Sequence, residues 1–224
     1  RALQRSEGLF DVISSEPSNP WVTGVEMLYS REFLETLKSR LAPGGVTVQW
    51  IHLYEIDSET LELVLRTYLS VFDRVSIWYG NRSDLLILGY EGERQEEDLE
   101  QLLARVARPD IRAGLARVGL EGPEALAAHE LVPDGVMGFE SLAPGPVHTL
   151  EQPILSDRAA RAFFRGDGAR LPYVGDLSPQ QALRWRSTIG ALDEFAEGLS
   201  LEAYGRYADE VCRHRPLQCA VVLA

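Results

Sequence analysis

Four short apolar segments in the first ninety residues are predicted strands, and only four residues separate the last two. The segments are 9–15, 46–51, 75–79 and 84–89. Stretches with helical spacing separate the first three, and this alternation predicts an α/β fold with a parallel sheet. A parallel crossover needs a dozen or more residues, so the last two segments must pair as an antiparallel hairpin. We therefore expect parallel strands that end in a hairpin, with the first strand buried on both faces.

Two helices are predicted between these strands. Ser30 is the expected N-cap of the first helix, whose apolar positions continue to Leu41. A proline and two glycines in the segment 42–45 then end this helix. Asp57 or Ser58 is the expected N-cap of the second helix. Both helices are expected to cover the sheet.

The chain changes character after Tyr90. An acidic stretch leads into helical patterns, with short helices expected near 110–118 and 156–164, and the region between them is rich in proline and glycine. Two further helices are expected towards the C-terminus. We predict three parts: a partial α/β domain at 1–90, a helical and irregular extension at 91–177, and a C-terminal helical hairpin at 178–224.

Charge and cysteine content narrow the classes of partner and compartment. The chain has 34 acidic and 22 basic side chains, a formal charge of −12. Such a surface repels nucleic-acid phosphate, so we expect no nucleic-acid partner. No apolar run reaches the ~18 residues of a transmembrane helix. Two cysteines, Cys212 and Cys219, do not form a disulfide framework, and this favours a cytoplasmic location.

The loop after the first predicted strand carries the residues best suited to chemistry. Pro17 and Pro20 disfavour a helix and stiffen this loop, which contains Glu16, Ser18 and Asn19. Ligands of open parallel sheets bind beyond the carboxyl ends of the strands, where this loop lies. A carboxylate beside an amide suits general-base work on an amine. The alternative is that Glu16 and Asn19 cap neighbouring backbone groups.

Further candidates follow the second predicted strand. Gln49 lies at its end and either lines the cleft or is an ordinary polar residue at a strand end. His52, Tyr54 and Glu55 follow on what we expect to be a loop, where they are candidates to close the site. The favoured interpretation of His52 is a partly exposed loop histidine. No metal site is predicted, because the cysteines and the histidine of the segment 212–219 fit no familiar zinc spacing.

Several of these motifs together resemble the spermidine/spermine synthase family, the polyamine aminopropyltransferases, and more closely a bacterial branch often fused to a membrane segment. The resemblance covers about residues 1–90. It rests on the predicted hairpin and on Phe10-Asp11-Val12-Ile13, Leu28-Tyr29-Ser30-Arg31-Glu32-Phe33 and Leu41-Ala42-Pro43-Gly44-Gly45. It implies the C-terminal half of a Rossmann-like methyltransferase sheet. It also implies decarboxylated S-adenosylmethionine, or S-adenosylmethionine itself, as co-substrate, with no prosthetic group.

The family's loop reads Asp-x-x-Asp-Pro, and each of its positions can be matched to a residue of this chain. The first aspartate, the proposed base, falls on Glu16, which keeps the charge; the second falls on Asn19, which loses it. The resemblance further implies that Gln49 and Tyr79 contact the substrate, and we expect Ser18 to contact it from the proline-stiffened loop. The family's nucleotide-binding motifs lie upstream of the matching segments and are not found here. We therefore expect the chain to begin inside a domain, with any membrane link only upstream.

Three functions remain open. The first is aminopropyl transfer to a small-molecule amine by a spermidine-synthase-like enzyme, with a homodimer possible. The second is methyl transfer from S-adenosylmethionine, because the loop also resembles the Asn-Pro-Pro-Tyr motif of amino-methyltransferases. The third is a catalytically degenerate domain that serves binding or assembly.

Overall fold

The computed structural model describes residues 3, 8–80, 83–92, 104–120, 126, 129–132, 134 and 137–171. The chain divides into two compact units. The first combines Arg1–Arg94 with Val132–Ser178, and the second combines Gln95–Leu131 with Pro179–Ala224. In the second unit the helix α5 (Pro109–Arg117) agrees with the helix expected near 110–118. The predicted C-terminal hairpin at 178–224 lies outside the described residues, and the predicted domain boundaries stay predictions.

The sheet is mixed, as an α/β fold that ends in a hairpin requires. Its strands are β1 (Phe10–Ser15), β2 (Leu41–His52), β3 (Arg74–Tyr79), β4 (Asp84–Tyr90) and β5 (Glu130–Val132), in the order β1-β2-β4-β3-β5. β1 is parallel to β2, whereas β4 is antiparallel to both β2 and β3. The predicted hairpin is therefore confirmed. Its second strand, β4, inserts between β2 and β3, so β3 runs in the same direction as β1 and β2.

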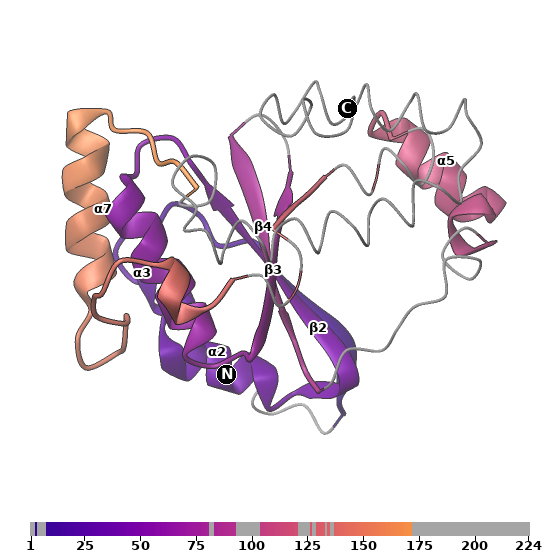
Figure 1. The fold of residues 1–224 in the computed structure, drawn as a ribbon, viewed down its shortest axis with the longest axis horizontal. Coiled ribbons are helices and arrows are strands. Elements are labelled where there is room, and N and C mark those ends of the chain that lie inside the picture. Colours follow the sequence, from indigo (N-terminus) through magenta and orange to yellow (C-terminus); the bar gives the residue numbers. More distant parts are fainter. Residues whose placement is uncertain are drawn as a thin grey trace. The chain divides into compact units, whose positions relative to one another are not determined.

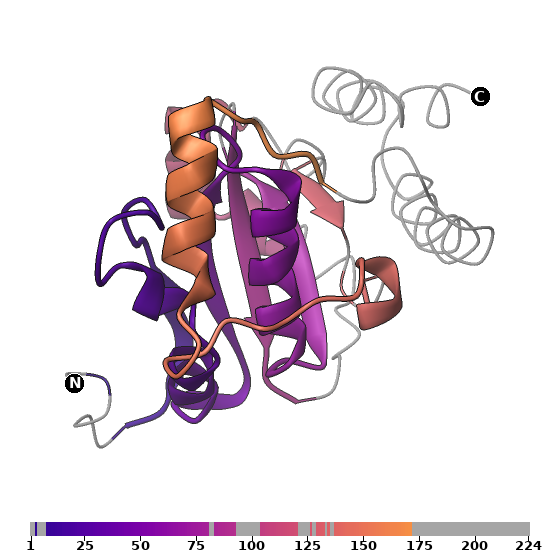
Figure 2. The ribbon, with the colours of Figure 1, turned by 90° about the vertical axis from the view of Figure 1, so that its left-hand side faces the viewer.

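The helices of the first unit lie together on one side of the sheet (Figure 1). They are α2 (Arg31–Lys38), α3 (Ser58–Leu69) and α7 (Ile154–Arg165), and a short 3-10 helix, η1 (Glu26–Tyr29), precedes α2. α7 agrees with the helix expected near 156–164 and runs beside α3 (Figure 2). Both predicted N-caps are confirmed: Ser30 accepts the Phe33 amide at 3.3 Å, and Asp57 accepts the Thr60 amide at 2.8 Å.

The core of this unit forms where α3 packs on the sheet. Leu61, Val64 and Leu65 of α3 are fully buried, as are Ile77 and Ile87 of the strands. The Phe72 ring leaves no room for a side chain at Gly89 of β4. A Cβ atom at Gly89 would lie 2.7 Å from this ring. Close packing of this kind explains why a glycine interrupts the apolar residues of β4.

The start of β2 corrects the sequence-based prediction. The strand begins at Leu41 rather than at 46, and α2 ends at Lys38. Phe10 pairs with Leu41 but Val12 pairs with Val46, so the segment 42–45 bulges from the ladder. Gly44 in this bulge adopts φ +77°, a conformation that other residues rarely take. The proline and the glycines therefore shape a bulge inside the strand instead of a loop before it.

The burial of β1 is a second correction. The strand was expected to be covered on both faces, yet Val12 is 58% exposed and Phe10 is 37% exposed. β1 stands at the end of the strand order, with β2 as its neighbour, so one of its edges carries no paired strand among the described residues. The unpaired backbone groups of an exposed apolar edge strand can form hydrogen bonds with a further strand.

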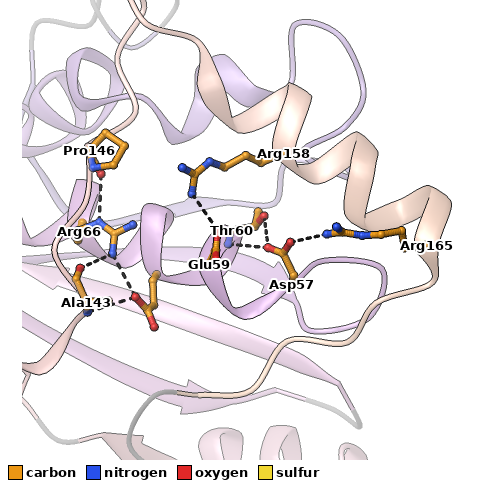
Figure 3. A network of polar contacts seen from close by, with 9 residues as sticks. Asp57, Glu59, Thr60, Arg66, Ala143, Pro146, Arg158 and Arg165 are labelled. Carbon is orange, nitrogen blue, oxygen red and sulfur yellow. Dashed lines mark hydrogen bonds and ion pairs between the residues drawn. The ribbon is translucent and has the colours of Figure 1, made fainter.

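A segment that follows far along the chain crosses α3, and we call Ala143–Leu150 the strap. Arg66 of α3, 5% exposed, holds it through hydrogen bonds to the carbonyls of Ala143 at 2.8 Å and Pro146 at 3.1 Å (Figure 3). The strap's His148 donates its backbone amide to the Thr67 hydroxyl at 2.9 Å. The irregular region predicted here is thus fixed by buried polar groups of α3.

Candidate active site at the carboxyl ends of β1 and β2

The parallel pair β1 and β2 brings two predicted site segments to one edge of the sheet. Ser15 ends β1 and pairs with Gln49 of β2, so the loop that begins at Glu16 starts beside the last residues of β2. Side chains at this edge face the region where open α/β sheets bind their ligands. We call residues 16–24 the site loop.

The site loop exposes polar groups and buries its prolines. Pro17 and Pro20 are buried, whereas Glu16 and Ser18 are exposed and Asn19 is half-buried. The Asn19 carbonyl accepts the Val22 amide at 3.0 Å, which closes a turn within the loop. The carboxylate and the hydroxyl therefore remain accessible to a ligand. Their catalytic and binding roles stay predictions.

Gln49 is fully buried and both ends of its amide are bonded within the protein. Its Nε2 donates to the Leu28 carbonyl at 2.9 Å, and its Oε1 accepts the Tyr68 hydroxyl at 2.5 Å. The Tyr29 hydroxyl donates to the Trp50 carbonyl at 3.2 Å. These bonds tie η1 and α3 to β2. Gln49 thus positions the chain that follows the site loop, and the predicted contact of its side chain with substrate stays a prediction.

Tyr79 lies farther away in the sheet. It is the last residue of β3 and pairs with Leu85, and β4 stands between β3 and β2. Because β3 runs parallel to β2, Tyr79 ends its strand at the same edge as the site loop. Of the five predicted site residues, the backbone places Glu16, Ser18, Asn19 and Gln49 on adjacent segments, and Tyr79 two strands away from Gln49.

The structure adds an aromatic cluster that the sequence analysis did not identify: Trp21, Trp50, His52, Tyr54 and Phe163. The His52 ring centre lies 5.0 Å from that of Trp21, 5.2 Å from that of Trp50 and 4.4 Å from that of Tyr54. Trp21 in turn packs on Phe163 of α7, with ring centres 4.8 Å apart. The cluster joins the site loop, the end of β2 and α7 into one structure.

His52 is the last residue of β2 and is fully buried, so the expectation of a partly exposed loop histidine is wrong. Trp21, Trp50 and Tyr54 surround the imidazole, which accounts for its burial. Neither of its ring nitrogens has a hydrogen-bond partner among the described residues. Burial lowers the pKa of His52 from 6.5 to about 4, although the charge of Asp84 opposes this shift. His52 is therefore a neutral imidazole at pH 7.

This lowered pKa predicts a pH-dependent stability. Between pH 6.5 and about 4 the unfolded chain protonates His52 while the folded chain does not, so the free energy of unfolding falls as the pH falls. The loss amounts to about 3 kcal/mol at pH 4, at ~1.4 kcal/mol per pKa unit. Urea unfolding at a series of pH values should show this slope, and His52→Phe should flatten it. An unchanged slope in the variant would contradict the burial of a neutral imidazole.

The end of α7 and the residues that follow it contact the loop between β2 and α3. Arg165 pairs with Asp57, the N-cap of α3, at 2.9 Å, as Figure 3 shows. Ala169 donates its amide to the Leu53 carbonyl at 2.7 Å, and Gly168 forms a bridge with Tyr54. More than a hundred residues separate these partners, so the sequence pattern carried no signal for their contact.

Among the residues that the structure describes, no group of three or more His, Cys, Asp and Glu side chains is arranged to hold a metal ion. The described helices include none that is both long and apolar enough to cross a lipid bilayer.

Comparison with known proteins finds similarity to a curated protein but no match to a family model. No family model matches the chain. Over 75 residues, the chain is 37% identical to polyamine aminopropyltransferase 2 of Pseudomonas aeruginosa. This stretch covers 33% of the present chain and 22% of the relative, so the chain matches less than a quarter of the relative's length. The chain is therefore similar over a third of its length to a polyamine aminopropyltransferase.

Proposed function

We propose that this chain is part of a spermidine-synthase-like transferase that moves an aminopropyl group from decarboxylated S-adenosylmethionine to an amine. The observation that carries this proposal is the 37% identity to a polyamine aminopropyltransferase. An exposed carboxylate and hydroxyl on a proline-stiffened loop, at the carboxyl ends of two parallel strands, support it.

The sheet supports a finer proposal about the fold. An antiparallel strand inserted before the last parallel one, in the order β1-β2-β4-β3, is compatible with the C-terminal half of a Rossmann-like methyltransferase sheet. The exposed apolar residues of β1, and its edge that has no paired strand in the described part of the chain, are compatible with a further strand pairing there. In this proposal the nucleotide-binding half of the sheet adjoins β1, and the described half binds the acceptor.

The chemistry assigned to the site loop is general-base catalysis. The amine nitrogen attacks the terminal aminopropyl carbon that is bonded to the sulfonium. The new C–N bond forms as the C–S bond breaks, and the electron pair of that bond returns to sulfur to give neutral methylthioadenosine. The proton lost by the amine goes to the Glu16 carboxylate, while Asn19 and Ser18 orient the nitrogen through hydrogen bonds.

Methyl transfer is the second candidate, and the segment Asn19-Pro20-Trp21 favours it. An amide followed by a proline and an aromatic residue can hold a target nitrogen without the second carboxylate of the aminopropyltransferase pattern. The donor is then S-adenosylmethionine, and its by-product is S-adenosylhomocysteine.

Product analysis separates these candidates. The protein expressed from its natural reading frame would be incubated with 1,4-diaminobutane and either donor, and the nucleoside products identified by mass spectrometry. We expect methylthioadenosine from the decarboxylated donor. Formation of S-adenosylhomocysteine instead would replace the proposal by methyl transfer. Donor binding without either product would indicate a degenerate binding domain.

A further inference from the structure

His52 is a buried polar group that has no hydrogen-bond partner among the described residues. Its side chain is fully buried, and neither ring nitrogen forms a hydrogen bond among the described residues. Buried polar groups in folded proteins are nearly always bonded, because an unpaired one loses its bonds to water without replacement. The other buried imidazole of this unit differs, since Nε2 of His148 lies 2.9 Å from the Glu26 carbonyl. An unpaired imidazole at a strand's carboxyl end is thus an exception that calls for a ligand.

The Trp21 side chain contacts the His52 imidazole through packing of the two rings. Trp21 meets His52 edge to face, and its other neighbour is Phe163. Backbone hydrogen bonds in and directly after the site loop close local turns, from the Val22 amide to the Asn19 carbonyl and from the Val25 amide to the Val22 carbonyl. Because Trp21 contacts the imidazole by ring packing, a ligand that takes the place of the Trp21 ring reaches His52.

We propose that His52 is a binding residue for the acceptor amine, with the surrounding aromatic rings as the walls of its site. This inference rests on the proposed function. A neutral imidazole nitrogen accepts a hydrogen bond from an amine or an ammonium group. Aromatic faces attract a cation, and Tyr54, 44% exposed, and Trp21 offer such faces beside His52. The ligand class is therefore a primary amine on an aliphatic chain.

Charge in the neighbourhood agrees with a cationic ligand. Asp84 pairs with His52 across the β2–β4 ladder, and its charge acts on the imidazole. Glu16 lies exposed on the same loop as Trp21. In this proposal one nitrogen of the diamine bonds to His52 and the other is held by Glu16, where the proposed transfer takes place.

The test measures binding of 1,4-diaminobutane to the full chain by calorimetry, with His52→Phe, His52→Gln and Glu16→Gln as variants. His52→Phe keeps an aromatic ring in the cluster but has no nitrogen, and should weaken binding about 10- to 100-fold, as expected for a lost bond to a charged group. His52→Gln restores a donor and an acceptor and should recover most of the affinity. Circular dichroism would check that each variant folds.

A second measurement keeps the inference testable if His52→Phe does not fold. In the natural chain, saturation with 1,4-diaminobutane should shift the NMR signals of the His52 ring, and those of His148 should stay in place. An unmoved His52 signal would overturn the inference. Binding that is lost in Glu16→Gln but unchanged in His52→Phe would overturn it too, and would leave the proposed function standing. Absence of any binding by the natural chain would count against both.

Discussion

Replacing Arg66 with leucine is expected to lower the free energy of unfolding by about 3–5 kcal/mol, the range measured when one partner of a buried ion pair is removed. Arg66 is 5% exposed, and its guanidinium bonds to the carbonyls of Ala143 and Pro146 and to Glu62 at 3.2 Å. Leucine fills much of the volume but leaves the Ala143 and Pro146 carbonyls without the guanidinium, whereas Glu62 keeps only the Ala143 amide as its partner. Urea unfolding followed by circular dichroism measures the loss.

Arg158→Leu is the matched control. Arg158 lies on α7 and reaches Glu59 at 3.8 Å, a carboxylate that is 83% exposed. Figure 3 shows this pair beside the Arg66 network. Exposed pairs contribute little, so this change should stay within ~0.5 kcal/mol of the natural chain. Equal losses in both variants would show that Arg66 stabilises α3 by its charge alone and does not hold the strap.

The Glu16→Gln substitution should lower kcat for amine transfer about 10²- to 10⁴-fold, the usual contribution of a general base. Glutamine has nearly the same shape but cannot take the proton. Because Glu16 is exposed, the free energy of unfolding should hardly change. Initial rates of methylthioadenosine formation, with thermal unfolding on the same samples, measure both quantities.

Asp11→Asn provides the comparison for this variant, since Asp11 is an exposed carboxylate on β1 before the site loop. It should retain full activity. Unchanged turnover in Glu16→Gln would remove Glu16 from the role of base. A marked loss of stability in Glu16→Gln would instead support the alternative in which this carboxylate caps the neighbouring backbone.

Local patterns in the sequence were sufficient for much of the fold. The N-caps Ser30 and Asp57 and the hairpin of β3 and β4 depend on residues only a few positions apart, and the structure confirms them. The bulge at 42–45 was misassigned because proline and glycine mark both loops and bulges. Whether they interrupt a strand depends on pairing with β1, a contact that local sequence does not show.

The parts of the site that could not be predicted depend on distant contacts. His52 is buried because Trp21 and Tyr54 pack around it, and its position after Trp50 and Ile51 did not indicate this. Phe163 joins the site from a helix more than a hundred residues after Trp21. The sequence does show Trp50 and Tyr54 close to His52, but their contact with the imidazole is visible only in the folded structure.

Arg66 and the strap are in contact in the folded protein but far apart in the sequence, and this distance matters while the ribosome synthesises the chain. Pro146 follows Arg66 by 80 residues and Ala143 follows it by 77. At about 5–20 residues per second, a ribosome needs roughly 4–16 s to cover that distance. Throughout this interval the nascent α3 carries a guanidinium without its carbonyl partners and an apolar face that α7 does not yet cover. Codons that slow translation before residue 143 therefore lengthen the time in which α3 of the emerging chain lacks these contacts.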